Sequence, residues 1–120
     1  MRFAHVTISV KDLEESLGFY NTVVGLPVTR RFSAGPGREI VFLGKEGETE
    51  VELIGGARGE PSFGQDISLG FEVESLDRTM QFLRDKGIDP GEVQSPNPSV
   101  KMIFIRDPNG LRIQFLEQTR

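Results

Sequence analysis

The second half of the chain repeats the pattern of the first half, and this internal repeat limits the fold more than any other feature. A shift of 63 residues places Leu13 on Leu76, Leu17 on Met80 and Phe19 on Phe82. A shift of 62 residues places Val41-Phe42-Leu43 on Ile103-Phe104-Ile105 and Val51-Glu52-Leu53 on Ile113-Gln114-Phe115. Because the apolar positions match in both helix-like and strand-like segments, we interpret the chain as two copies of one module.

Each copy predicts one helix and four strands in the order βαβββ. In the first copy we expect a strand at 3–10, a helix that Asp12 caps and Gly25 ends, and strands at 26–33, 38–44 and 49–54. In the second we expect a strand at 67–74, a helix that Ser75 caps and Gly87 ends, a weak strand at 92–94, a loop at 95–99, and strands at 100–106 and 111–117. This order predicts an α+β fold: a single domain with module one at 1–55, a linker at 56–65 and module two at 66–120.

Composition excludes several classes of function. The 120 residues include no cysteine, so the chain has no thiol nucleophile, disulfide or zinc–thiolate site. The net charge of −4 argues against nucleic acid as a partner, because phosphate binding needs a basic face. No apolar run approaches the ~20 residues of a membrane span. The amino terminus enters a strand at once instead of forming a signal peptide, so a cytoplasmic location is expected.

The polar faces of four strands carry the candidate site. Alternation in the first strand puts Ala4, Val6, Ile8 and Val10 on one face and the only histidine, His5, on the other. The last strand of module one likewise places Glu52 opposite its apolar face, and the equivalent positions in module two are Ser68 and Gln114. Imidazole, carboxylate and amide oxygen are ligands for Zn²⁺, Ni²⁺, Mn²⁺ or Fe²⁺, whereas a serine hydroxyl is a poor one. A lone histidine such as His5 is more often a hydrogen-bonded or exposed residue than a metal ligand, and Glu52 alone would be an exposed strand carboxylate.

Several motifs in register resemble one known family. They are His5-Val6-Thr7-Ile8-Ser9-Val10, Asp12-Leu13-Glu14-Glu15-Ser16, Phe19-Tyr20, Gly25-Leu26, Val51-Glu52-Leu53, Asp107-Pro108-Asn109-Gly110 and Ile113-Gln114-Phe115-Leu116-Glu117. Together they resemble the vicinal oxygen chelate superfamily, which includes glyoxalase I, bleomycin-resistance proteins and extradiol dioxygenases. The resemblance covers essentially the whole chain and is closest to the glyoxalase I type.

The resemblance implies a fold, a partner and a chemistry. The two modules are expected to form open, cupped sheets, paired across a homodimer. His5, Glu52 and Gln114 are expected to hold a divalent metal, with Glu52 and Gln114 as the catalytic residues. Ser68 replaces a histidine and Gln114 replaces a glutamate that normally also serves as base, so Glu52 is left as the base. The implied activity is that of a metal-dependent lyase or isomerase, related to lactoylglutathione lyase, that acts on a small carbonyl or hydroxy-acid substrate.

A second interpretation is a protein with the same cupped sheets but no catalytic activity. A non-catalytic protein of the bleomycin-resistance type would bind or sequester a small molecule without a metal, among Phe3, Phe42, Phe63 and Phe104. A metal-dependent dioxygenase is a weaker third, because its usual two histidines are missing. Phe3, Thr7, Ser68, Gly70 and Phe104 are the expected substrate pocket. Arg30, Arg31 and Arg38 are expected either to protect a sheet edge or to meet an anionic substrate. Phe19, Tyr20, Met80 and Phe82, on the helix stripes, are expected in the core.

Overall fold

The computed structural model describes residues 1–56, 60–63 and 66–119. Contacts between Cα atoms divide the chain into two compact units, Met1–Ser62 and Phe63–Arg120. Each unit is described by itself below. Among the helices of the described ranges, none has the length and apolar character that crossing a membrane requires.

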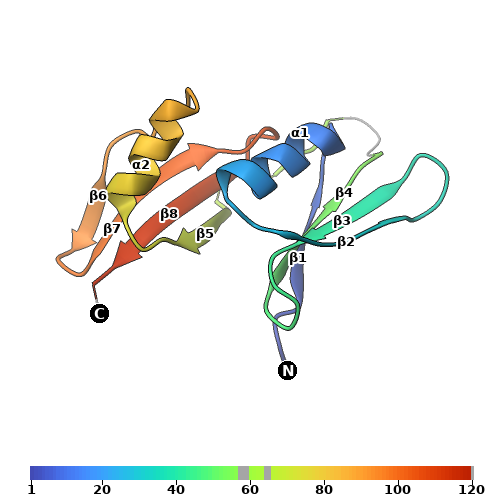
Figure 1. The fold of residues 1–120 in the computed structure, drawn as a ribbon, viewed down its shortest axis with the longest axis horizontal. Helices are drawn as coiled ribbons and strands as arrows, with labels where there is room; N and C mark the ends of the chain where they lie inside the picture. Colours follow the sequence, from blue (N-terminus) through green and yellow to red (C-terminus); the bar gives the residue numbers. More distant parts are fainter. Residues whose placement is uncertain (57–59, 64–65, 120) are drawn as a thin grey trace. The chain divides into compact units, whose positions relative to one another are not determined.

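Unit 1 is a four-stranded mixed sheet with one helical segment (Figure 1). Its elements are β1 (His5–Ser9), α1 (Leu13–Gly18), the π-helical turn η1 (Phe19–Val23), β2 (Val28–Ser33), β3 (Glu39–Leu43) and β4 (Glu50–Ile54). The strand order is β1-β4-β3-β2, in which β1 and β4 are parallel and the other neighbours are antiparallel. The predicted single helix is therefore divided, because α1 passes into a π-helical turn at Phe19 before Gly25 leaves the helix with φ +87°.

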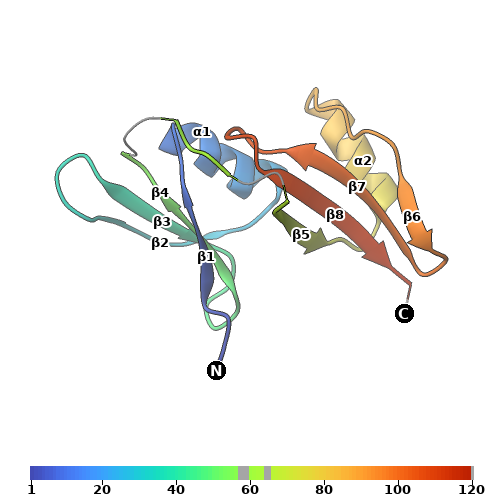
Figure 2. The same ribbon diagram turned by 180° about the vertical axis from the view of Figure 1, so that it is seen from behind.

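Unit 2 repeats this arrangement. Its elements are β5 (Ser68–Glu72), α2 (Leu76–Asp85), β6 (Gln94–Asn97), β7 (Val100–Arg106) and β8 (Arg112–Gln118). The strand order is β5-β8-β7-β6, again with the first pair parallel (Figure 2). The prediction for β6 was wrong: the strand covers most of the segment 95–99 that we expected to be a loop. Pro96 fits there because β6 lies at the edge of its sheet, where a missing N–H is tolerated.

The helices begin where the sequence predicts. The Asp12 carboxylate accepts the Glu15 N–H at 3.1 Å, and the Ser75 hydroxyl accepts the Arg78 N–H at 3.2 Å. These caps satisfy backbone donors that have no partner within the helix. Gly87 follows α2 with φ +77°, which favours glycine.

One face of each sheet is buried and the other carries the polar side chains. α1 contacts β4 and α2 contacts β8. The buried apolar residues include Ile8, Tyr20, Val41, Leu43, Leu53, Leu76, Leu83, Ile103, Ile113 and Phe115. Phe19, Tyr20 and Met80 are buried as predicted, whereas Phe82 is 40% exposed and does not belong to the core.

Candidate active site

His5 and Glu52 meet on the polar face of unit 1. The parallel pairing of β1 with β4 sets Thr7 beside Glu52 and His5 beside Glu50. His5 Nε2 lies 3.4 Å from Glu52 Oε1. The imidazole is 40% exposed and the carboxylate only 12%, so the pair is a shielded carboxylate beside an accessible ring.

Thr7 orients the carboxylate of this pair. Its hydroxyl donates a hydrogen bond of 2.5 Å to Glu52 Oε1, the same oxygen that faces His5. Thr7 is predicted for the substrate pocket, and in the structure its hydroxyl binds Glu52. Because both contacts are made by Oε1, Oε2 is the oxygen that remains to receive a proton.

A second carboxylate, which the sequence analysis did not single out, lies on the same face. Glu50 is 8% exposed, and it is two residues before Glu52 on β4. The Thr29 hydroxyl donates to its Oε2, and Arg30 Nη2 donates to its Oε1 at 3.3 Å. The Arg30 guanidinium stacks 3.9 Å from the centre of the Phe42 ring, which in turn meets the His5 ring edge-on at 5.4 Å. A continuous set of contacts therefore runs from Arg30 through Phe42 to His5.

Unit 2 places different side chains at the equivalent positions. In unit 2, Gly70 pairs with Gln114 at the positions that Thr7 and Glu52 occupy in unit 1. Likewise, Ser68 pairs with Arg112 at the positions of His5 and Glu50. Gln114 Nε2 donates to Met102 Sδ at 2.9 Å. A Cβ atom at Gly70 would lie 2.8 Å from Gln114 Oε1, so the room above this glycine holds the amide oxygen.

The other predicted pocket residues are dispersed over the two units. Phe3 precedes β1, is 69% exposed, and accepts a hydrogen bond from the Thr49 hydroxyl through its carbonyl oxygen. Ser68 is exposed at the start of β5. The Arg112 guanidinium lies over Phe104 of β7, and its Cζ is 4.2 Å from the centre of the phenyl ring. Phe42, a candidate for the metal-free pocket, is 6% exposed.

The donors of unit 1 are compatible with a divalent ion. Two donors about 2.1 Å from one ion, in tetrahedral directions, are about 3.4 Å apart. The separation between His5 Nε2 and Glu52 Oε1 is 3.4 Å. Among the residues that the structure describes, however, no group of three or more histidine, cysteine, aspartate and glutamate side chains is arranged to hold a metal. The pair therefore fits two ligand positions, and the others would need amide oxygen or water.

The three nominated arginines have different surroundings. Arg31 binds Glu14 and Glu39. Its hydrogen bond to Glu39 holds the pKa of that carboxyl below its ordinary value. Arg31 thus acts within the fold, whereas Arg30 contacts Phe42, whose ring meets that of His5.

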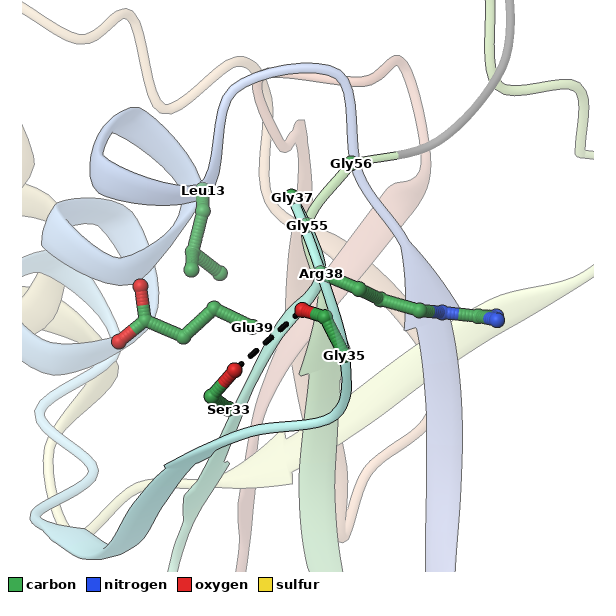
Figure 3. Close-up of a pocket in the computed structure, with 8 residues that line it drawn as sticks. All are labelled: Leu13, Ser33, Gly35, Gly37, Arg38, Glu39, Gly55 and Gly56. Atoms are coloured by element: carbon green, nitrogen blue, oxygen red, sulfur yellow. Dashed lines mark hydrogen bonds between the residues drawn. The ribbon is translucent and has the colours of Figure 1, made fainter.

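A cavity of about 400 Å³ lies elsewhere in unit 1. It is lined by Leu13, Ser33, Gly35, Gly37, Arg38, Glu39, Gly55 and Gly56. Figure 3 shows the Ser33 hydroxyl directed at the Gly35 carbonyl, 3.3 Å away, and the Arg38 side chain extending away from Leu13 and Glu39. The Arg38 guanidinium is therefore directed away from the Glu39 carboxylate that also lines this cavity.

Comparison with known proteins identifies the family. A sequence model described as Glyoxalase/Bleomycin resistance protein/Dioxygenase superfamily matches residues 2–115. The chain belongs to this superfamily. The predicted family and α+β fold are thereby confirmed, and the two four-stranded mixed sheets are those of the glyoxalase fold.

Three similar proteins cover almost the whole chain. A probable lactoylglutathione lyase of Synechocystis is 29% identical over 98% of this chain and 95% of its own length. The uncharacterized protein YwbC of Bacillus subtilis is 32% identical over 98% of both chains. The crystal structure of SMU.1112c superposes with a TM-score of 0.81, at 28% identity over 98% of both chains. The superfamily includes lactoylglutathione lyases, so an enzymatic activity is compatible with the family.

Proposed function

We propose that the protein is a divalent-metal-dependent lyase or isomerase of the glyoxalase type that acts on a small carbonyl or hydroxy-acid compound. The observation that carries this proposal is the 3.4 Å separation of His5 Nε2 and Glu52 Oε1 on one face of a sheet. Relatives named lactoylglutathione lyase support it at the level of the family.

His5 and Glu52 are the proposed metal ligands in unit 1, and the Gln114 amide oxygen is the proposed third. A bound divalent ion such as Zn²⁺, Ni²⁺, Mn²⁺ or Fe²⁺ would hold substrate oxygens and stabilise negative charge on them. Gln114 would reach the pair either within one chain or across a homodimer. A homodimer, a small-molecule substrate and a cytoplasmic location are all parts of this proposal.

Glu52 is the proposed base. An amide takes no proton at neutral pH, so Gln114 binds and orients, and the carboxylate moves the proton. Thr7 holds Oε1 of Glu52, and Oε2 removes a proton from the carbon beside a substrate carbonyl. The same oxygen returns the proton to the neighbouring carbon, while the proton of the substrate hydroxyl passes through solvent to the former carbonyl oxygen, so a 2-hydroxy carbonyl compound is isomerised without an oxidant. Phe3, Thr7, Ser68, Gly70 and Phe104 are proposed to line the substrate.

The competing proposal is a metal-free binding or sequestration protein. The observation that favours it is the donor set: only two of the four positions carry an imidazole or a carboxylate, and the other two are Ser68 and Gln114. In that case Glu52 would accept a hydrogen bond from the bound molecule and no proton would move.

Metal stoichiometry decides between the two proposals. The protein is purified without chelators, and its metal content is measured for the wild type and for His5→Ala, Glu52→Gln and Glu48→Gln. Glu48, an exposed glutamate on the loop before β4, is the matched control. We expect about one equivalent of bound metal in the wild type and in Glu48→Gln. His5→Ala and Glu52→Gln should bind the metal at least tenfold more weakly. Less than about a tenth of an equivalent, unchanged by His5→Ala, would overturn the metal proposal.

Proton transfer is tested separately in D₂O. Incubation with 2-hydroxy aldehydes and 2-hydroxy ketones is expected to introduce deuterium at the carbon beside the carbonyl. Glu52→Gln should abolish this exchange, because an amide cannot take the proton. Exchange that persists at the wild-type rate in Glu52→Gln would remove Glu52 as the base.

A further inference from the structure

A second cavity of unit 1 is bordered by Glu50, the residue of β4 that pairs with His5. Its volume is about 400 Å³, and it is lined by Arg2, Thr29, Arg30, Glu46, Gly47 and Glu50. Glu50 pairs in register with His5, and it is two residues before Glu52 on the same face of β4. Residues so related along a strand are about 7 Å apart. A molecule long enough to span this distance would contact both the cavity and the pair.

An irregularity in β2 directs two consecutive side chains at Glu50. The register of β2 against β3 shifts between Val28 and Arg30, so an extra residue, Thr29, is inserted there. Such a bulge re-aims side chains that would otherwise alternate between faces. As a result Thr29 and Arg30 bind the two oxygens of the same carboxylate.

Arg30 is held in one orientation with part of its guanidinium unused. Glu50 anchors Nη2, and Phe42 supports the flat face of the group at 3.9 Å. An arginine has five N–H donors. No contact in the described part of the chain engages Nε or Nη1, and the side chain is 53% exposed. A guanidinium fixed in this way loses little freedom on binding an anion.

Arg2 supplies a second guanidinium to the same cavity. Its Nη1 donates to the Glu48 carbonyl oxygen at 3.1 Å, which ties the amino-terminal segment to the loop that carries Glu46 and Gly47. Two arginines, Arg2 and Arg30, therefore line this cavity.

We propose that this cavity binds a carboxylate group of the substrate, with Arg30 as the residue that determines this specificity. The inference deepens the proposed function and rests on it, since it describes the part of the substrate away from the reacting carbons. A carboxylate fits better than a phosphate, because Glu46 and Glu50 also line the cavity and repel a doubly charged anion more strongly. The planar carboxylate also matches the geometry of the guanidinium.

Amide signals observed by NMR test the proposal. The probe is sodium glycolate, the smallest 2-hydroxy acid, and its neutral counterpart glycolamide is the ligand control. At constant ionic strength, glycolate is expected to shift the signals of Thr29, Arg30 and Gly47 with a dissociation constant of about 1–10 mM. Arg30→Gln should weaken this binding at least tenfold. Arg38→Gln removes one exposed charge from a side chain outside this cavity, and it should change the binding by less than about twofold.

Three results would overturn the proposal. They are the lack of a saturable shift at these residues up to about 100 mM glycolate, equal binding of glycolamide, and tighter binding of inorganic phosphate than of glycolate. The titration is repeated on His5→Ala, which removes a proposed metal ligand but no residue of the cavity. Glycolate binding should persist in His5→Ala, and glycolate binding by a wild-type protein that holds no metal would mean that the metal proposal had failed while the carboxylate site stood. A full metal complement without glycolate binding would mean the reverse.

Discussion

Gly70→Ala should displace Gln114 while leaving the protein folded. The added Cβ would lie 2.8 Å from Gln114 Oε1 and 3.5 Å from Leu116 Cδ2. An ordinary contact with the amide oxygen is about 3.3 Å, so the amide must withdraw by about 0.5 Å, at a cost of about 1 kcal/mol in side-chain torsion. Against this, alanine restricts the unfolded chain and stabilises by about 0.4–1 kcal/mol. The net change in the free energy of unfolding should therefore be within about 1 kcal/mol.

The same substitution should have a measurable effect on the proposed metal site. If Gln114 is a ligand, its displacement by Gly70→Ala should weaken metal binding about tenfold. Gln114→Ala should weaken metal binding as well. Urea unfolding and metal titration measure the two quantities separately. Gly56→Ala is the matched control for unfolding, because its Cβ would lie 2.1 Å from the Gly37 carbonyl oxygen at φ +81°, and it should cost more than about 2 kcal/mol. A loss above about 2 kcal/mol for Gly70→Ala would refute the reasoning about its neighbour. An unchanged metal affinity would refute the role of Gln114.

Three further substitutions test the surroundings of the site and the fold. Glu50→Ala removes a buried acceptor of two hydrogen bonds and should lower the free energy of unfolding by about 2 kcal/mol in urea; a loss below about 0.5 kcal/mol would contradict its structural role. The Glu117 carboxylate accepts the first N–H of α2, that of Leu76, at 2.7 Å, and Glu117→Ala removes this acceptor. Amide hydrogen exchange in the first turn of α2 should then accelerate about tenfold. Unchanged exchange would show that Glu117 does not cap the helix. The hydrogen bond from Arg31 lowers the pKa of Glu39 in the folded protein below its ordinary value of 4.5. The ion pair of the two residues therefore stabilises the fold above pH 4.5, and this stabilisation is lost as the pH falls through the lower pKa of the folded state. The urea midpoint of Glu39→Gln should therefore decline less steeply with acid than that of the wild type, and parallel curves would contradict this.

The repeat made the fold predictable from the sequence. Matching apolar positions at shifts of 62 and 63 residues imply matching strand registers, and the structure has them: His5 pairs with Glu50 as Ser68 pairs with Arg112. The errors lie where local preference and tertiary pairing disagree. The segment around Pro96 has the composition of a loop, but pairing with β7 makes part of it an edge strand. The π-helical turn at Phe19 has no signal in apolar spacing alone, because the same residues remain buried.

The candidate site was predictable only in part. Alternation alone placed His5 and Glu52 on the polar faces of their strands. The partner of Arg30 could not be found in this way, because the bulge at Thr29 breaks the alternation from which faces are assigned. Alternation puts Glu50 on the same face as Glu52, but nothing in the pattern marks it as a site residue. Its burial depends on contacts with another strand, and a charged residue in an alternating strand usually faces water.

Divergence between the two modules explains why the proposed chemistry is centred in unit 1. At the position of Thr7, which orients a carboxylate, unit 2 has Gly70, and at the position of Glu52 it has Gln114. The two changes are coupled, because the glycine leaves room for the amide oxygen that a larger residue would displace. In unit 1, by contrast, the hydroxyl, carboxylate and imidazole form one bonded group. A Thr7→Val substitution removes the hydroxyl and keeps the shape, so it should slow proton transfer by Glu52 without unfolding unit 1. If deuterium exchange were equally fast in Thr7→Val, the orientation of Glu52 by Thr7 would have no part in the reaction.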